Sequence, residues 1–112
     1  MSTAADNSDT FKVGPEQPIV SNEHGGMQAL NLYAFDLIPA APLFALAQVM
    51  GEGAKKYVKN NWLKITPDDH FAHLQAHLWA WQAGDKQDDH MGHALARMFM
   101  LFETDRVKDI AK

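Results

Sequence analysis

Two long segments in the second half of the chain show apolar residues at helical spacing, and only a short turn separates them. The apolar residues of residues 67–83 recur at three- and four-residue steps and are Phe71, Leu74, Leu78 and Trp81. Within residues 88–107, apolar residues recur at the same steps and are predicted to face inward; they are Met91, Leu95, Met98, Phe99 and Phe102. Because helices joined by a short link pack as antiparallel neighbours, the pattern predicts an antiparallel helical hairpin.

The ends of the first of these segments have residues that start and stop helices. Thr66 is suited to cap a helix that begins at Pro67, because its hydroxyl can accept a hydrogen bond from a free backbone N–H. Asp68 and Asp69 would lie near the positive end of that helix. Gly84 is suited to end it.

A third helix is predicted over residues 39–58, with Pro39 in its first turn. Its apolar residues share one face and are Leu43, Leu46, Met50, Ala54 and Tyr57. Gly51 and Gly53 weaken its middle, so a break there is an alternative. We find no strand signal of consequence and no internal repeat. The sequence therefore predicts an all-α fold of three principal helices.

Residues 1–30 are rich in Ser, Asp, Asn and Gly, and they show neither a helical nor a strand period. We interpret them as a mobile N-terminal arm, with a short docked piece at residues 17–20 as the alternative. The folded part is then a helical domain over residues 31–112. A chain of 112 residues is the size of one domain.

The composition argues against several classes of protein. A net charge of −4 argues against a duplex nucleic acid partner, which needs a basic surface. The chain has no cysteine, which excludes disulfides and thiolate metal sites. The first residues are polar, unlike a signal peptide, and no apolar stretch approaches the roughly 20 residues of a membrane helix. The sequence therefore predicts a cytoplasmic protein with no membrane partner.

Apolar residues also occur away from the main stripes of the predicted hairpin. One such face of its first helix combines Ala72, Ala76, Trp79 and Ala83. A small domain gains stability when a second apolar face is covered. The sequence therefore predicts a homo-oligomer.

Five of the six histidines lie between residues 70 and 93. The antiparallel hairpin brings the end of its first helix next to the start of its second, which predicts one histidine–aspartate cluster of His77, Asp85, Asp88, Asp89, His90 and His93. Imidazole and carboxylate together suit zinc, manganese, iron or nickel, whereas magnesium prefers carboxylates and water. The alternative is that Asp88 and Asp89 cap the second helix while the histidines pair or pack.

A lysine–aromatic segment occupies residues 55–64. Its four lysines stand in an otherwise acidic chain and are Lys55, Lys56, Lys59 and Lys64. Interleaved with them are Tyr57, Asn60, Asn61 and Trp62. Lysines can bind phosphates, aromatic rings can stack on a base, and amides can read its edge, so the segment indicates a nucleotide site. The alternative is a solvated helix end in which the aromatic rings belong to the core.

Three motifs in order, "FDLIP", "GEGAKKYVKNNW" and "HLWAWQAGDKQDDHMGHALA", resemble the small helical domain of the phage dATP/dGTP diphosphohydrolase family. The resemblance extends over about residues 30–103. It implies an all-α domain that binds purine nucleotides in the cytoplasm of a phage host. It also implies cleavage of deoxynucleoside triphosphates between the α- and β-phosphates, with a divalent metal such as magnesium, manganese or zinc.

The resemblance also implies roles for individual residues. The implied metal ligands are His77, Asp88, His90 and His93. Asp89 and His93 are the implied catalytic residues, which would orient water. The implied nucleotide-binding residues are Lys56, Tyr57, Asn61 and Trp62, with the lysine on phosphate and the asparagine and tryptophan on the nucleoside.

The chain departs from the family pattern in its third motif. Ala76 replaces an arginine, Asp85 and Lys86 replace a Glu-Asp pair, a Glu-Ser-Gly segment before the paired histidines is missing, and Ala96 replaces a tryptophan. Two functions therefore stay open. The first is a diphosphohydrolase that releases nucleoside monophosphate and pyrophosphate. The second is an inert sponge that sequesters a nucleotide, such as a host immune signal. A helical structural protein whose histidines only pack is a third alternative.

Overall fold

The computed structural model describes residues 16–109, and these fall into two compact units that divide between Ile38 and Pro39. In its described part, the first unit contains a small hairpin followed by a short 3-10 helix. The second unit contains the three long helices.

The first unit is built around two short antiparallel strands, β1 (Ile19–Ser21) and β2 (Met27–Ala29). The side chain of Asn22 accepts hydrogen bonds from the backbone N–H groups of His24 and Gly26, both at 2.9 Å, and so fixes the turn. Gly25 takes the left-handed conformation at φ +83°, which a residue with a side chain rarely adopts.

The expectation that the chain has no strand of consequence is wrong for this segment. Three-residue strands are too short to show an alternating pattern, and the Asn22 turn rather than an apolar face specifies the pairing. A short 3-10 helix, η2 (Phe35–Leu37), follows. The mobility of residues 1–30 stays a prediction, and residues 1–15 lie outside the described part.

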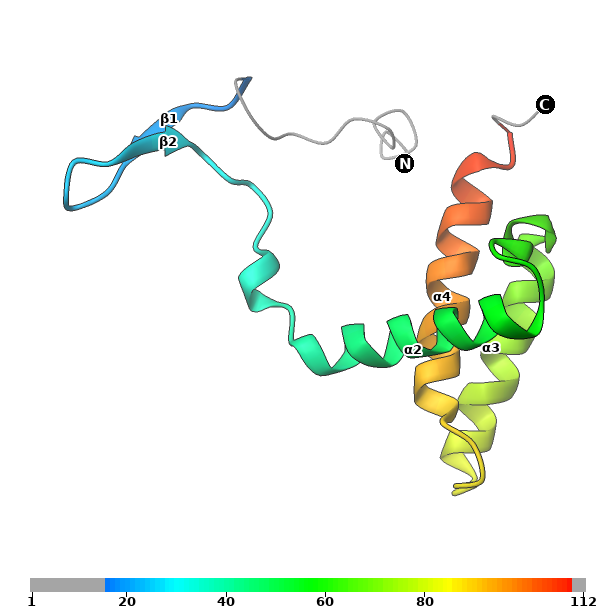
Figure 1. Cartoon of the computed structure of the whole chain (residues 1–112). Helices are drawn as coiled ribbons and strands as arrows, with labels where there is room; N and C mark the ends of the chain where they lie inside the picture. The colour runs from blue at the N-terminus through cyan, green and yellow to red at the C-terminus, as the bar shows by residue number, and fades with distance from the viewer. Residues whose placement is uncertain (1–15, 110–112) are drawn as a thin grey trace. The chain divides into compact units, whose positions relative to one another are not determined.

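The second unit contains α2 (Ala40–Lys56), the 3-10 helix η3 (Asn61–Lys64), α3 (Pro67–Gln82) and α4 (His90–Val107). The helices α3 and α4 lie side by side and run antiparallel, and the last turns of α2 lie across α4 (Figure 1). The all-α fold with an antiparallel hairpin is therefore confirmed. The break considered at Gly51 and Gly53 does not occur, since α2 continues through both.

The helix ends follow the capping signals in the sequence. The Thr66 hydroxyl accepts a hydrogen bond from the Asp69 N–H at 3.2 Å, with Pro67 at the first helical position. Gly84 takes a φ of +89° just after α3. At the start of α4, the Asp89 carboxylate accepts from the Gly92 N–H at 3.0 Å. A Cβ atom on Gly92 would overlap that carboxylate, so a larger residue there would make the carboxylate turn aside.

Helix α4 buries its small residues rather than its large ones. Its buried positions are Gly92, Ala94, Ala96 and Thr104. The inward orientation predicted for its large apolar residues is wrong: Met91, Met98, Phe99 and Phe102 are exposed, and Leu95 is half-buried. Small residues let α4 approach its neighbours closely, and the large side chains then remain on the outer arc of the helix.

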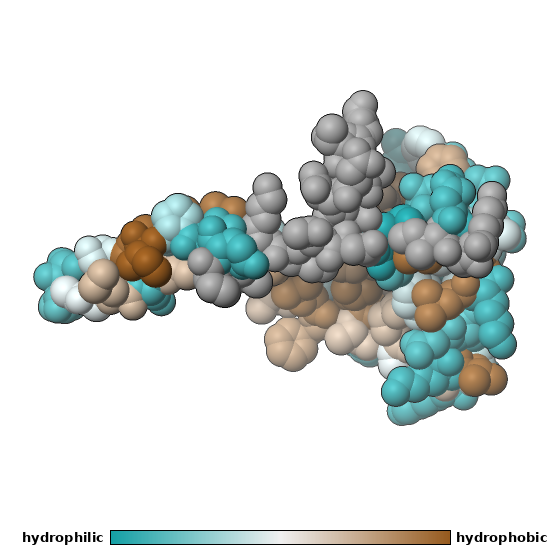
Figure 2. Space-filling view, turned by 90° about the horizontal axis from the view of Figure 1, so that it is seen from above, coloured by the Kyte–Doolittle hydropathy of each residue, from teal (hydrophilic) through white to brown (hydrophobic). Residues whose placement is uncertain are grey.

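Helix α3 shows the same imbalance. Of its predicted stripe only Leu74 is buried, while Phe71, Leu78 and Trp81 are exposed. Trp79, from the predicted second face, is 64% exposed. Within residues 16–109 the buried hydrophobic side chains are Leu74, Ala94 and Ala96. Apolar residues therefore reach the surface of the helical unit, and several appear in brown between polar residues in Figure 2.

Among the described residues, no helix has both the length and the apolar character needed to cross a bilayer.

Candidate functional site

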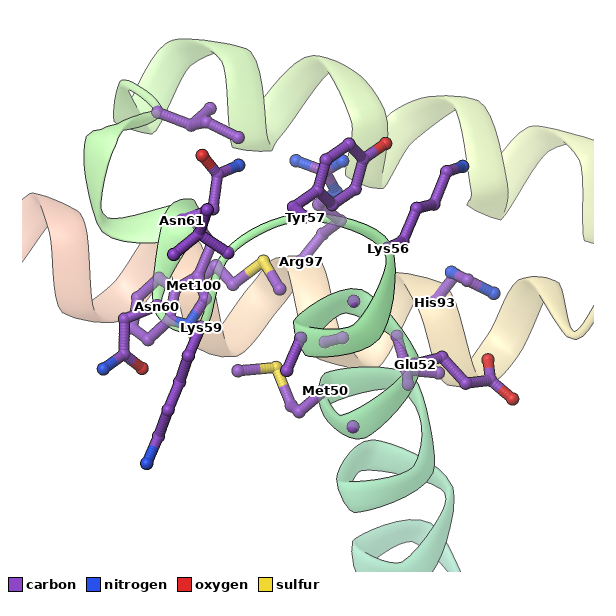
Figure 3. A pocket seen from close by; sticks show the side chains of 18 of the residues that line it. Met50, Glu52, Lys56, Tyr57, Lys59, Asn60, Asn61, His93, Arg97 and Met100 are labelled. Carbon is purple, nitrogen blue, oxygen red and sulfur yellow. The ribbon is translucent and has the colours of Figure 1, made fainter.

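The last turns of α2, the loop that follows, η3, α3 and α4 enclose a cavity of about 620 Å³ (Figure 3). The lysine–aromatic segment forms one wall, and the predicted nucleotide-binding residues that line it are Lys56, Tyr57, Asn61 and Trp62. The histidine–aspartate cluster contributes a second group of lining residues, which are His77, Asp88 and His93. Two groups of residues that the sequence identified separately therefore share one cavity.

The lysine–aromatic wall is formed where α2 ends. The chain leaves α2 at Tyr57 and turns through Asn60, which has a left-handed φ of 64°, before η3 begins. The Lys56 Nζ lies 5.4 Å from the centroid of the Tyr57 ring. Lys59 also lines the cavity, but its side chain points away from Arg97 and His93 (Figure 3). Lys55 and Lys64 are not part of the lining.

The histidine–aspartate cluster forms where α3 ends and α4 begins. The Nδ1 atoms of His77 and His90 are 3.0 Å apart. The His93 ring stacks on His77 with centroids 5.0 Å apart, and its Nε2 lies 3.4 Å from the Asp88 Oδ1. The neighbourhood predicted from the short turn therefore exists.

Three members of this cluster have the arrangement of metal ligands. One ligand atom each from His77, Asp88 and His90 lies within 4.8 Å of the others. His93 is adjacent but is not part of that close set. Two imidazole nitrogens and one carboxylate oxygen are a donor set that zinc or manganese accepts readily.

The hydrogen bonds around His90 fix which nitrogen is available to a ligand. His90 Nε2 forms a short hydrogen bond with the Asp85 carboxylate, which assigns the ring proton to Nε2. That bond holds the pKa of Asp85 below its usual value. The lone pair on His90 Nδ1 therefore points toward His77, as in the carboxylate–histidine–metal arrangement of many metal sites.

His77 is held in the neutral form that a ligand must have. Burial lowers the pKa of His77, and the neighbouring charges of His93 and His90 lower it further. A neutral imidazole keeps a lone pair for a cation at neutral pH.

Asp89, predicted as a catalytic residue, acts as the cap of α4 and does not line the cavity. The capping alternative is thus confirmed for Asp89, and its catalytic role stays a prediction. Asp88 differs, because its side chain reaches the cavity while also accepting from the Asp89 N–H at 2.8 Å.

The sequence analysis did not identify the pair of hydrogen bonds that the buried His70 makes with Trp62 and Arg97. His70 is fully buried, and its Nε2 lies 3.0 Å from the carbonyl oxygen of Trp62. Its Nδ1 lies 3.0 Å from Nη1 of Arg97, which lines the cavity. His73, one turn later on α3, is exposed. His77 is half-buried, so the three histidines of α3 have three different environments.

A comparison with protein families gives one match. The family model described as dATP/dGTP diphosphohydrolase, N-terminal, matches residues 22–111. The chain belongs to this family. The match confirms the resemblance drawn from the three motifs, and it spans most of the chain, including both groups of residues that line the cavity. No curated protein and no solved structure matches the chain.

Proposed function

We propose that the cavity binds a purine deoxynucleoside triphosphate and that the bound triphosphate is cleaved between its α- and β-phosphates. The products are then the nucleoside monophosphate and pyrophosphate. The observation that supports this proposal is the sharing of one cavity by the lysine–aromatic segment and the histidine–aspartate cluster. The description of the family supports the class of substrate. Such substrates are found in the cytoplasm, which is the compartment that the proposal implies.

The cavity has the size and the chemistry for this ligand. About 620 Å³ lies within the usual range of small-molecule sites, roughly 300–1,000 Å³. Trp62 and Tyr57 offer rings on which a base can stack, and Asn61 offers an amide to its edge. Lys56 brings positive charge to the same wall and is the proposed phosphate ligand.

The residues present fit a divalent metal, which the family implies. His77, Asp88 and His90 would hold it, with His93 at the side of the cluster and Asp85 orienting His90. A bound metal of this kind neutralises phosphate oxygens and lowers the pKa of a coordinated water. With two imidazoles among three donors, zinc or manganese suits the set better than magnesium.

A second candidate function is a nucleotide sponge that binds without cleavage, for example to remove a host immune signal. One observation favours it. Of the three aspartates in the cluster, only Asp88 lines the cavity, since Asp85 bonds His90 and Asp89 caps α4. Phosphoryl transfer depends on charge neutralisation and on an oriented water. A cavity to which the cluster contributes one carboxylate, with Glu52 on the α2 side, can retain affinity without supporting the reaction.

Incubation with nucleotides distinguishes the two functions. We expect purified protein to convert dATP or dGTP to the monophosphate and pyrophosphate when Mn²⁺ or Zn²⁺ is supplied, and EDTA to stop the reaction. Products are separated by ion-exchange chromatography, with ATP as a comparison substrate. Recovery of intact nucleotide from heat-denatured protein would instead support the sponge. If no nucleotide is bound or cleaved, both functions are excluded.

We also propose that the protein is a homo-oligomer in which a second copy covers the outer arc of α4. Phe102 is 68% exposed and shares that arc with Met91, Met98 and Phe99, while the helical unit buries few large side chains of its own. Exposed apolar surface of this kind is typical of an interface. Two copies of a small domain that share such a face bury more surface than each does alone.

Light scattering tests the oligomer. We expect a mass at least twice the 12.5 kDa of one chain at micromolar concentration. Phe102→Glu should reduce the mass to that of one chain, because burying a carboxylate in an apolar interface costs several kcal/mol. Lys86→Glu, in the exposed turn between α3 and α4, is the control and should leave the mass unchanged. A mass of 12.5 kDa for the unaltered protein would contradict the proposal.

A further inference from the structure

Arg97 lines the cavity together with the carboxylates of Glu52 and Asp88, but its guanidinium is paired with neither of them. Its side chain is half-buried, and no carboxylate of residues 16–109 forms an ion pair with it within 4.0 Å. The other arginine, Arg106, contrasts with it, because Glu103 binds its guanidinium through both carboxylate oxygens at 2.9 and 2.7 Å. A half-buried charge without a counter-charge is unfavourable unless a ligand supplies one.

A hydrogen bond to His70 fixes the orientation of the Arg97 guanidinium. Because His70 Nε2 donates its proton to the Trp62 carbonyl, Nδ1 has a lone pair and accepts from Arg97 Nη1. His70 is fully buried and therefore cannot turn to another partner. One N–H of the guanidinium is used in this bond, and the remaining donors are available to a ligand in the cavity.

The electrostatic environment supports the same conclusion. Burial lowers the pKa of Arg97, and the group that opposes this shift is the hydroxyl of Tyr57 rather than a carboxylate. Even so, a guanidinium stays charged at neutral pH. The cavity therefore presents a permanent cation in a partly desolvated place, where an anion is bound more strongly than at the surface.

The neighbours of Arg97 indicate which anion it binds. His93 lies one turn earlier on α4, and Lys56 lines the cavity from the end of α2 (Figure 3). Two cationic side chains thus line the space next to the histidine–aspartate cluster. The planar fork of an arginine matches the oxygens of a phosphate group, and a polyphosphate can reach several such donors at once.

We propose that Arg97 binds the phosphate chain of the ligand and that His70 is the positioning residue that holds its guanidinium toward the cavity. This proposal rests on the nucleotide-binding function proposed above and adds the residue that recognises the charged end of the ligand. Through its other nitrogen, His70 is hydrogen-bonded to the carbonyl oxygen of Trp62, a residue of the wall proposed to bind the base. A chain of two hydrogen bonds therefore joins Trp62, His70 and Arg97.

Titration calorimetry on the full chain tests the role of Arg97, with dATP, deoxyadenosine and inorganic tripolyphosphate as probes. Arg97→Gln is expected to lower the affinity for dATP and for tripolyphosphate by roughly 10- to 100-fold, which is the effect of losing a charged hydrogen bond. Deoxyadenosine affinity should stay unchanged. Arg97→Lys should lie between, because it keeps the charge and loses the fork. Lys86→Gln, in the exposed turn between α3 and α4 and outside the lining of the cavity, is the control and should bind dATP like the unaltered protein.

The role of His70 has its own variant. At a temperature where the variant is folded, His70→Gln should lower the affinity for dATP and for tripolyphosphate severalfold. Its affinity for deoxyadenosine should stay unchanged. A merely structural histidine would change all three affinities together, and that result would remove the positioning role.

Chemical modification provides a measurement that needs no variant. Phenylglyoxal modifies accessible arginines, and tripolyphosphate is expected to slow the modification of Arg97 at least severalfold while leaving Arg106 unaffected. Mass spectrometry of peptides distinguishes the two sites. Equal modification of Arg97 with and without a bound polyphosphate would overturn the proposal.

The outcomes separate this proposal from the proposed function. Unchanged dATP affinity in folded Arg97→Gln would overturn the role of Arg97 and leave the nucleotide site standing. If tripolyphosphate binds in an Arg97-dependent way, and dATP binds no more tightly than tripolyphosphate while deoxyadenosine does not bind, the role of Arg97 is supported. The nucleotide site is then contradicted. If the unaltered protein binds none of the three probes, both proposals are wrong.

Discussion

Replacing His70 with alanine is expected to lower the free energy of unfolding by roughly 3–5 kcal/mol, the usual size for a buried side chain whose loss leaves a cavity and removes two hydrogen bonds. These bonds join His70 to the Arg97 guanidinium and to the Trp62 carbonyl, which also accepts from the Ile65 N–H. Urea denaturation followed by circular dichroism measures the change. His73→Ala is the matched control, since His73 is exposed on the same helix and should change stability by less than about 0.5 kcal/mol.

The same variant should also alter how stability depends on pH. Burial lowers the pKa of His70, so the unfolded chain takes up a proton at a higher pH than the folded one does. Stability from this group is therefore fully present above about pH 6.5, the unfolded histidine value, and is lost as pH falls toward the lower folded value. The unaltered protein should lose stability between pH 7.5 and 5.5 more steeply than His70→Ala. Two results would contradict this role of His70. One is a parallel pH dependence of stability in the unaltered protein and in His70→Ala, and the other is an equal loss of unfolding free energy in His70→Ala and His73→Ala.

Replacing His77 or Asp88 is expected to have the largest effect on metal binding. Either His77→Ala or Asp88→Asn removes one donor of the close set, and affinity for Mn²⁺ or Zn²⁺ should fall by more than roughly 100-fold, which exceeds the usual effect of losing an outer partner. Asp85→Asn tests that outer partner: it keeps all three donors but weakens the bond that orients His90, so a loss of roughly 10- to 100-fold is expected. Calorimetric titration of chelator-treated protein measures all of these affinities.

His93→Ala distinguishes the close set of three from the predicted set of four. If His93 only orients water or phosphate, the variant should keep its affinity for the metal and lose metal-dependent hydrolysis. Affinity in the unaltered protein should fall as pH decreases below about 6.5, because protons then compete for the ligating histidines. Burial lowers the pKa of His77, so this donor takes up a proton only at a lower pH than an exposed histidine does. If neither ion releases heat at neutral pH with nucleotide present, the cluster is not a metal site.

The helices could be predicted because their signals are local. Thr66, Pro67 and Gly84 mark the ends of α3, and apolar periodicity marks its length, so its boundaries agree with the structure to within a residue. The hairpin followed from the short turn, and with it the proximity of His77 to His90 and His93. These predictions needed no information from distant parts of the chain.

The parts that could not be predicted depend on long-range packing. Periodicity groups Met91, Met98 and Phe102 on one arc of α4, but it does not say whether that arc meets the rest of the chain or another molecule. The cavity depends on where the end of α2 crosses α4, which no spacing in the sequence specifies. His70 lies on the same helix as His77, yet it is fully buried and contacts Trp62 in η3 and Arg97 in α4, neighbours that no spacing in the sequence specifies.

The absence of a side chain at Gly92 leaves room for the position that the Asp89 carboxylate takes over the first turn of α4. With a larger residue at this position the carboxylate would have to turn aside, whereas the backbone that presents His90 and His93 meets no obstacle. Asp89, the two histidines and Gly92 appear as D-H-x-G-H in the sequence. A homologue that keeps both histidines but replaces this glycine is therefore expected to cap the helix with another side-chain rotamer. The histidines, and not the glycine, then mark the candidate metal site in other members of the family.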